Sequence, residues 1–330
     1  MTPRRSIGPV HFGPGEEFDL IRRLVNPADL LPTGVSLGPG DDAAVLEGGW
    51  VLSTDLSLEG VHFRRAWLED QEIGFRAVSC ALSDLAAMAA VPVGVFISMA
   101  ANDKEVVEAL QSGCREAASE VGAVILGGDL SNTSGPVFID VVSLGSANQP
   151  GLRSGAVAGN DIWVTGRLGA SSTAVRVWQC GGEPPPEARK AFAQPSPRCD
   201  EGHYLVERGI ASALIDLSDG LAGDSAHLAA ASGVQIVLEE ARVPVAPIAV
   251  EVLGPEEALQ AALHGGEDYE LCFAAGPDAV DPSYFQDHFG LEVTRVGYVR
   301  EGSGVWIDRG GSQPEPLMRS GFDHYTADVL

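Results

Sequence analysis

The pattern of apolar and polar positions predicts alternating helices and strands along the first half of the chain. Apolar residues recur every three or four positions over 70–90, which predicts a long helix that Asp70 caps and that ends before Pro92. Similar spacing predicts a short helix over 18–25 and a further helix that begins after Asp103. Short apolar runs that are rich in β-branched residues predict strands at 50–52, 93–99, 124–126 and 137–144.

The second half of the chain continues this alternation after a Pro-Gly pair at 150–151. Helices are expected over 171–179 and between 220 and 232, and proline-rich stretches near 181–186 and 194–197 are interpreted as connectors. Apolar runs predict strands at 161–165, 213–217, 234–238, 271–273, 293–299 and 305–307.

Length bears on the number of domains. Because 330 residues exceed the usual size of one hydrophobic core, we expect two domains of α/β (α+β) class. The predicted domains cover 16–150 and 151–330, and a loose N-terminal extension covers 1–15.

Composition and charge narrow the classes of partner. The chain carries 21 Lys and Arg against 46 Asp and Glu, a formal net charge of −25. Nucleic acids and anionic membranes require a basic patch, so we expect neither as a partner. No apolar run approaches the length of about 18 residues that predicts a membrane span, and the first residues lack the apolar core of a signal peptide. The five cysteines are scattered without metal-ligand spacing, which is typical of a reduced protein, and we expect a cytoplasmic location.

Six aspartates share a context that indicates metal binding. Asp84 falls on the apolar face of the helix over 70–90, where an unpaired carboxylate is costly. The other five follow a glycine turn or end an apolar strand; they are Asp42, Asp55, Asp129, Asp216 and Asp219. Converging carboxylates repel one another unless cations lie between them, and Ser53, Thr54 and Ser218 add neutral oxygen ligands. These residues predict a cluster of Mg²⁺-type ions that bridges phosphates. Separate surface turns, with Asp84 bonded to a loop backbone, are the alternative interpretation.

The common nucleotide-binding motifs are absent from the sequence. It contains no GxxxxGK[ST] loop, no GxGxxG between a strand and a helix, and no HRD-type kinase loop. His62 is a candidate ligand contact, and Arg153 carries the planar guanidinium that matches phosphate geometry. A structural histidine and a surface arginine are the alternative interpretations of these two residues.

Seven motifs follow one another along the chain. They are Gly-Asp-Asp-Ala-Ala at 40–44, Ser-Thr-Asp at 53–55, His-Phe at 62–63, Leu-Ser-Asp-Leu-Ala-Ala-Met at 82–88, Gly-Gly-Asp at 127–129, Ile-Asp-Leu-Ser-Asp-Gly at 215–220 and Gly-Gly-Glu-Asp-Tyr-Glu-Leu at 265–271. In this order, over about 15–325, they resemble the thiamine-monophosphate kinase family. That family belongs to a superfamily with aminoimidazole-ribonucleotide synthetase and selenophosphate synthetase.

The resemblance implies a fold, an oligomeric state and an activity. The fold is two-domain and aminoimidazole-ribonucleotide-synthetase-like, with an N-terminal mixed sheet and helices and a C-terminal α/β domain. Two copies are expected to form a homodimer through their N-terminal sheets. The activity is transfer of the γ-phosphoryl group from the co-substrate ATP to thiamine monophosphate, which needs several Mg²⁺ ions and yields thiamine diphosphate and ADP.

The resemblance also implies residue roles. The expected ATP contacts are Gly128, Asp129, Arg153 and Ser218. The expected thiamine monophosphate contacts are His62, Glu267 and Phe322. The expected magnesium ligands are Asp42, Ser53, Thr54, Asp55, Asp84, Asp129, Asp216 and Asp219, of which Asp55, Asp84 and Asp219 are also the expected catalytic residues. Because the acceptor is already a phosphate nucleophile, catalysis is expected to consist of positioning and charge neutralisation rather than strong general-base chemistry.

Three other functions remain compatible with these motifs. The first is an ATP-dependent enzyme of the same superfamily that acts on another small molecule. The second is a non-catalytic nucleotide- or metal-binding regulator, and the third is a metal-dependent phosphatase. A substrate panel separates the first, and binding without turnover or release of free phosphate identifies the other two.

Overall fold

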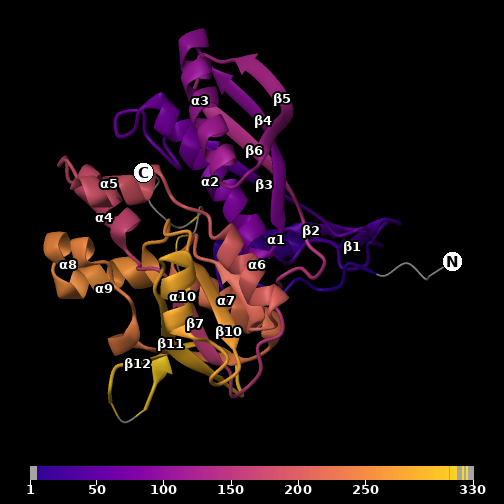
Figure 1. Cartoon of the computed structure of the whole chain (residues 1–330), viewed down its shortest axis with the longest axis vertical. Coiled ribbons are helices and arrows are strands. Elements are labelled where there is room, and N and C mark those ends of the chain that lie inside the picture. The colour runs from indigo at the N-terminus through magenta and orange to yellow at the C-terminus, as the bar shows by residue number, and fades with distance from the viewer. Residues whose placement is uncertain (1–5, 312, 318–321, 323–324, 326–330) are drawn as a thin grey trace.

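The strands form two sheets, one in each half of the chain (Figure 1). The computed structural model describes residues 6–311, 313–317, 322 and 325. The first sheet has six strands in the order β1-β2-β3-β6-β4-β5, and only the β4–β5 pair is parallel. Its strands are β1 (Val35–Leu37), β2 (Ala44–Leu46), β3 (Trp50–Leu58), β4 (Val91–Ala101), β5 (Val124–Asn132) and β6 (Phe138–Ser146).

The second sheet has seven strands in the order β13-β12-β9-β11-β7-β10-β8, and only the β9–β12 pair is parallel. Its strands are β7 (Asp161–Thr165), β8 (Ala211–Asp216), β9 (Gln235–Glu239), β10 (Leu271–Ala275), β11 (Val293–Arg300), β12 (Gly304–Asp308) and β13 (Glu315–Pro316). Two mixed sheets with helices confirm the predicted fold class.

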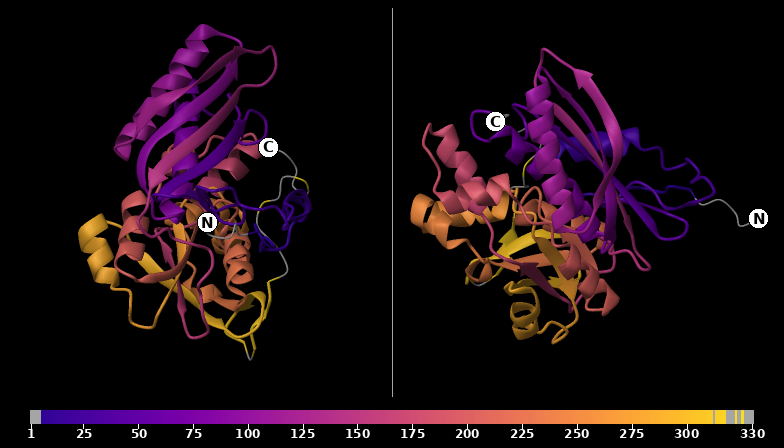
Figure 2. Two further views of the ribbon diagram at one scale, coloured as in Figure 1. Left: turned by 90° about the vertical axis from the view of Figure 1, so that its right-hand side faces the viewer. Right: turned by 45° about the horizontal axis from the view of Figure 1, so that its top comes forward.

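One face of the first sheet is covered by two helices, α2 (Asp70–Ala87) and α3 (Lys104–Glu120) (Figure 2). Side chains on a strand alternate between the two faces, so the opposite face carries every second residue. Apolar side chains on that face are open to solvent: Trp50 is 44% exposed, Leu56 43% and Phe96 43%.

Helix α2 belongs to both halves of the molecule. It packs against α3, β3 and β6, and also against α5 (Pro186–Ala193), α6 (Cys199–Glu207) and β8. Most of its residues are buried, as expected for a helix that is covered on several sides. The hydrophobic core beneath the first sheet therefore continues into side chains from the second half, among them Trp178 and Phe192.

The helix termini confirm one predicted cap and correct another. Asp103 accepts a hydrogen bond from the backbone N–H of Glu105 at 3.1 Å and caps α3, as predicted. The predicted cap of α2 at Asp70 is wrong, because Glu69 occupies the N-cap position. Glu69 and Glu72 form a reciprocal capping box, in which the N–H of Glu69 donates to Glu72 Oε2 at 2.8 Å.

Two strands are longer than their apolar runs predict, and this changes the position of two aspartates. Strand β3 pairs with β6 without interruption from Trp50 to Leu58, so Asp55 lies inside the strand rather than at its end. Strand β5 continues beyond the glycines to Asn132 and holds Asp129 in the same way. Polar residues on a half-exposed strand continue the hydrogen bonds between strands as well as apolar residues do. The end of an apolar run therefore does not mark the end of the strand.

Four helices that the sequence did not predict begin with proline, whose fixed φ suits the first helical turn. Only the first of these prolines, Pro186, lies in a stretch that was interpreted as a connector. These helices are α5, α8 (Pro247–Leu253), α9 (Pro255–His264) and α10 (Pro282–Phe289). The remaining helices are α1 (Glu16–Leu24), α4 (Ala170–Gln179), α6 and α7 (Leu221–Ser232). Within the described residues, none of the helices combines the length and apolarity that crossing a membrane requires.

Candidate active site

A cavity of about 430 Å³ is lined by residues from both halves of the chain. Its walls come from α1, β3, α2, α4 and α5 and from the turns that follow β8 and precede β10. Nine residues that the sequence predicted for the site line this cavity: Thr54, Asp55, His62, Asp84, Asp216, Ser218, Asp219, Glu267 and Phe322. Polar groups converging in one concave site are typical of a ligand-binding pocket.

Three aspartates form what we call the carboxylate cluster: Asp42, Asp84 and Asp216. One oxygen from each lies within 4.8 Å of the others. Ser83 donates to Asp216 at 2.6 Å, and the hydroxyl of Ser53 donates to Asp84. The cluster joins strand and helix termini that are far apart in the sequence, as predicted from the contexts of these aspartates.

The carboxylates of the site raise one another's pKa values. Burial, and next the charge of Asp42, raises the pKa of Asp216 to about 7. Burial, followed by the charge of Asp216, raises the pKa of Asp84 well above its usual value. Burial and the nearby Glu267 raise the pKa of Asp55 to about 6. Buried like charges favour the protonated form, and a bound cation removes that penalty.

The donor set fits a hard divalent cation. Every ligand atom of the carboxylate cluster is an oxygen, which Mg²⁺ prefers. Oδ2 of Asp42 is buried and has no hydrogen-bond partner among the described residues. A buried carboxylate oxygen without a partner is costly, and a metal ion would satisfy it.

Arg153 supplies the nearest positive charge to the cluster. Its Nε and Nη2 donate to Oδ1 of Asp42 at 3.1 and 2.5 Å. Its backbone N–H donates to Oδ1 of Asp41 at 3.1 Å, so the whole residue is fixed against the loop over 38–42. The alternative interpretation of Arg153 as a surface residue is wrong, since its side chain is 14% exposed.

The loop over 265–269 is attached to the turn that follows β8. The N–H groups of Glu267 and Tyr269 donate to the carbonyls of Ser218 and Leu217, both at 2.8 Å. Gly266 has φ +64°, and a Cβ at this position would collide with the carbonyl of Ser218. The predicted substrate residue Glu267 is thereby held beside the aspartates of that turn.

Two residues that were predicted to contact a ligand, Thr54 and His62, also form hydrogen bonds within the protein. Thr54 donates its hydroxyl to Asp140 on β6 at 2.9 Å. Nδ1 of His62 accepts a hydrogen bond from the N–H of Leu58 at 3.0 Å, which orients the ring. The backbone N–H of Phe322 donates to the carbonyl of Asp219 at 3.0 Å and brings this late residue to the cavity.

Two predicted residues lie elsewhere. Gly128 and Asp129 are on β5 at the edge of the first sheet, where they line an open hollow of about 610 Å³ with residues of α3. Oδ1 of Asp129 accepts a hydrogen bond from the adjacent N–H of Leu130 at 3.0 Å. Within one chain, the structure does not bring these two residues to the cavity that holds Asp55 and Asp219.

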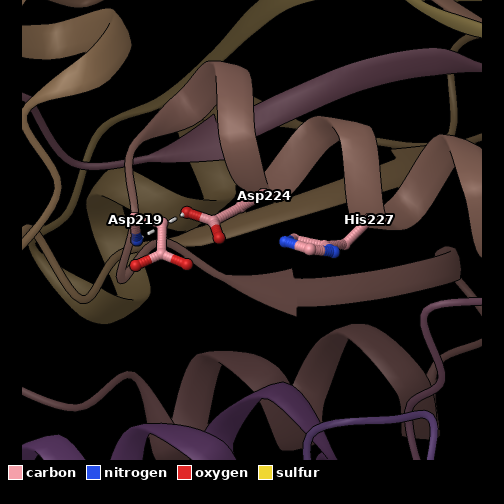
Figure 3. Close-up of side chains that lie close together, drawn as sticks. All are labelled: Asp219, Asp224 and His227. Carbon is pink, nitrogen blue, oxygen red and sulfur yellow. Dashed lines mark hydrogen bonds between the residues drawn. The ribbon is translucent and has the colours of Figure 1, made fainter. Parts of the chain in front are cut away.

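Asp224 and His227 lie in a row with Asp219, with Asp224 in the middle, and the sequence did not predict either of them (Figure 3). Both come from α7, three positions apart on one face, and Asp224 accepts a hydrogen bond from the N–H of Asp219 at 3.1 Å. Their spacing after the Asp-Gly turn was the available signal. Burial, with the charge of Glu17 as the next cause, raises the pKa of Asp219 to about 7.

Residues 12–15, which we call the N-terminal strap, and the helix that follows them are anchored on His227. The N–H of Gly13 donates to Nδ1 of His227 at 3.0 Å, and the ring centroids of Phe12 and Phe18 lie 5.9 and 4.1 Å from that of the imidazole. Helix α1 begins at Glu16, directly after the strap, and places Glu17 in the cavity wall. The close packing of the strap differs from the loose extension that was expected there.

Comparison with known proteins identifies relatives along most of the chain. Residues 40–147 match the family model for AIR synthase related protein, N-terminal domain. Thiamine-monophosphate kinase of Rhodopirellula baltica is 33% identical over 313 residues, which cover 89% of this chain and 93% of that protein. The crystal structure of thiamine-monophosphate kinase from Stenotrophomonas maltophilia K279a has a TM-score of 0.74 and 34% identity and covers 83% of this chain and 91% of its own. The structure of AaThiL complexed with AMPPCP and TMP has a TM-score of 0.80 and 28% identity, over 94% of this chain and 97% of its own.

Proposed function

The chain belongs to the thiamine-monophosphate kinase family, and on that premise we propose that it transfers the γ-phosphoryl group of ATP to thiamine monophosphate. The products are thiamine diphosphate and ADP. The observation that carries the proposal is the cavity, whose wall combines aspartates with a further carboxylate, Glu267, and with apolar and aromatic side chains. The aspartates suit a metal–phosphate chain, and the carboxylate with the aromatic side chains suits an organic cation such as thiazolium.

Magnesium binding by the carboxylate cluster is part of this proposal. The proposal is supported by the clustered oxygens, by the raised pKa values of Asp84 and Asp216, and by Oδ2 of Asp42, which has no partner in the described part of the chain. Asp55 and Asp219 extend the same wall and are proposed as further ligands. Bound Mg²⁺ ions neutralise phosphate charge and bridge phosphate oxygens, which a chain of net charge −25 cannot do with its own cations alone.

The side chains around the cluster position the two substrates. We propose that Arg153 and Ser218 contact the nucleotide phosphates, because a guanidinium and a hydroxyl beside the cluster match phosphate oxygens. His62, Glu267 and Phe322 are proposed to hold thiamine monophosphate. Since the acceptor oxygen is already anionic, the residues need only align it with the γ-phosphorus and exclude water.

A homodimer is proposed on the basis of the open face of the first sheet. Exposed apolar side chains gather there, namely Trp50, Leu56 and Phe96. We propose that this sheet meets its counterpart in a second copy. Gly128 and Asp129 would then contribute to the nucleotide site of the partner subunit rather than to that of their own chain.

The domain boundary and the location stay proposals as well. We propose domains over 16–150 and 151–330, since each range contains one complete sheet. A cytoplasmic location agrees with five cysteines that form no disulfide among the described residues and with the intracellular supply of ATP.

The proposed activity is tested by incubating the purified chain with ATP, Mg²⁺ and thiamine monophosphate and separating the products by chromatography. One thiamine diphosphate should form for each ADP, and removal of Mg²⁺ with a chelator should stop the reaction. Asp219→Asn should lower turnover by about 10²–10³-fold with unchanged thermal unfolding. Asp200→Asn, on the exposed side of α6, is the matched control and should be fully active. Free phosphate without thiamine diphosphate would identify a phosphatase, and ATP binding without turnover would identify a regulator.

A further inference from the structure

Three residues that line the cavity share a single partner behind the wall. We call them the aromatic wall; they are Phe192, Glu267 and Tyr269. The shared partner is Arg76 of α2, which is 3% exposed and does not itself line the cavity. Arg76 lies behind Glu267 and Tyr269, which are half-buried, and packs on Phe192, which is fully buried.

The guanidinium of Arg76 contacts all three. Nη1 donates to the carbonyl of Phe192 at 2.6 Å, and Nη2 donates to Oε2 of Glu267. The same guanidinium lies 3.9 Å from the ring centroid of Phe192 and 5.7 Å from that of Tyr269. A planar group with several fixed donors can make these contacts together, whereas a lysine ammonium cannot.

The backbone of Glu267 and Tyr269 requires support. Glu267 has φ +66° and Tyr269 has φ +50°, a left-handed conformation that residues with a side chain seldom adopt. Such conformations persist where surrounding contacts hold them, and they gather at ligand sites. Arg76 forms an ion pair with the side chain of Glu267 and lies near the ring of Tyr269, so it fixes the orientation of both.

We propose that Arg76 is a positioning residue for the organic cation of the substrate. It holds the Glu267 carboxylate and the ring of Tyr269, both half-buried, in the arrangement that receives the thiazolium and pyrimidine rings, while its stacking on the fully buried Phe192 fixes its own position. This inference rests on the proposed function. Arg76 does not repel the substrate cation, because its own charge is paired with Glu267 behind the wall.

The chemistry of recognition follows from the wall that Arg76 organises. A carboxylate lowers the energy of a nearby permanent cation, and aromatic faces add cation–π attraction. Arg76 engages Oε2 of Glu267, and the carboxylate has a second oxygen with which to face the ligand. We therefore expect the specificity for a cationic acceptor to depend on Arg76. We expect the affinity for ATP at the carboxylate cluster to be independent of Arg76.

The test compares Arg76→Met, Arg76→Lys and the double variant Arg76→Met/Glu267→Gln. Arg76→Met removes the charge and the donors at similar volume, and it leaves Glu267 without its buried partner. We expect the KM for thiamine monophosphate to rise about tenfold or more, with the KM for ATP changed less than about twofold. Arg76→Lys should recover only part of the affinity, because it restores the charge without the fork.

The double variant separates positioning from stability. It contains no unpaired charge, so its thermal unfolding should return to that of the wild type. Its affinity for thiamine monophosphate, measured by calorimetry without ATP, should remain low because the carboxylate is gone. Recovery of both properties in the double variant would show that Arg76 and Glu267 form only a structural ion pair.

Arg189→Met is a matched control. Arg189 also pairs with a glutamate of α2, Glu72, at 2.5 Å, and neither residue lines the cavity. Both KM values should be unchanged in this variant. Wild-type protein that binds thiamine monophosphate without transferring phosphate would overturn the proposed function alone. If the wild type is an active kinase and Arg76→Met binds thiamine monophosphate with unchanged affinity, the role of Arg76 is overturned and the proposed function stands.

Discussion

Arg153 donates two hydrogen bonds to one oxygen of Asp42, and the other oxygen of that buried carboxylate has no partner among the described residues. The chain therefore supplies one cation of its own to a cluster that carries three carboxylates. Arg153 satisfies Oδ1 of Asp42, and Oδ2 is available to a metal ion.

Replacement of Arg153 by glutamine should make the fold depend on Mg²⁺. Breaking a buried ion pair costs about 3–5 kcal/mol, because the remaining charge stays desolvated. We expect Arg153→Gln to be less stable than wild type by up to this amount without metal, and to gain more from added Mg²⁺. Urea unfolding with and without Mg²⁺ measures both quantities.

Arg295→Gln is the control for this comparison. Arg295 forms a similar half-buried ion pair with Asp161, 2.7 Å away, and does not line the cavity. Its loss should lower stability equally with and without Mg²⁺. An identical gain from Mg²⁺ in wild type and Arg153→Gln would contradict the prediction.

Mixing two inactive variants should restore activity if the site spans two chains. Asp55→Asn and Asp129→Asn are each expected to be nearly inactive. In a heterodimer, the cavity of the Asp129→Asn chain meets an intact Asp129 from the Asp55→Asn chain, and one complete site forms. Random exchange of subunits should then give about a quarter of the wild-type activity.

Exchange is verified with two differently tagged copies that purify together. If the mixture exchanges subunits but stays as inactive as the two variants, Asp55 and Asp129 do not complete one site across two chains. That result would contradict the proposed cross-subunit site. A chain that sediments as a monomer would also contradict it.

His227 should make the fold sensitive to acid. Burial lowers the pKa of His227 to about 3, while an unfolded histidine titrates near about 6.5. Only the unfolded state then takes up this proton as the pH falls from about 6.5 towards 3, so stability is lost over that range. The loss amounts to about 2 kcal/mol at about pH 5.

His227→Asn isolates this contribution. The Oδ1 atom of asparagine can take the place of Nδ1 and accept the hydrogen bond from Gly13, but it does not titrate. The difference in urea unfolding free energy between wild type and His227→Asn should therefore change by the stated amount between about pH 8 and pH 5. A difference that is independent of pH would show that His227 takes up its proton over the same pH range in the folded and the unfolded state, which would contradict the prediction.

Gly13→Ala should detach the N-terminal strap. A Cβ at this position would lie 2.8 Å from the Cβ of Ala226 and 3.2 Å from the backbone nitrogen of His227. Because the strap leads directly to Glu17 in the cavity wall, we expect kcat to fall about tenfold and protease to cut more readily before α1. Gly276→Ala, where no atom lies within 4 Å, is the control and should change neither measurement.

The sequence predicted those parts of the site whose signal is local. Aspartates beside glycine turns or on an apolar helix face indicated the carboxylate cluster, because each context is readable within about ten residues. The strand ends were placed wrongly near Asp55 and Asp129, since ladder pairing with β6 and β4 rather than composition decides where these strands stop.

Other parts depend on contacts that no local pattern contains. Gly13 and His227 are separated by 214 positions in the sequence and meet only in the fold. Arg76 was not identified because an arginine within a helix is usually exposed, and its burial follows from Phe192 and Glu267. The proline-led helices were missed for a different reason: proline both ends connectors and begins helices, and the tertiary packing decides which.

The two-sided packing of α2 has a consequence for synthesis on the ribosome. The first sheet is complete once Ser146 has been made, but the partners of α2 in the second half end only at Asp216. At about 5–20 residues per second, the intervening stretch takes roughly 4–14 s. For that time one apolar side of α2 is uncovered in the nascent chain. We expect truncated chains that end between about 150 and 200 to aggregate, and the growing chain to be a substrate for a chaperone during this interval.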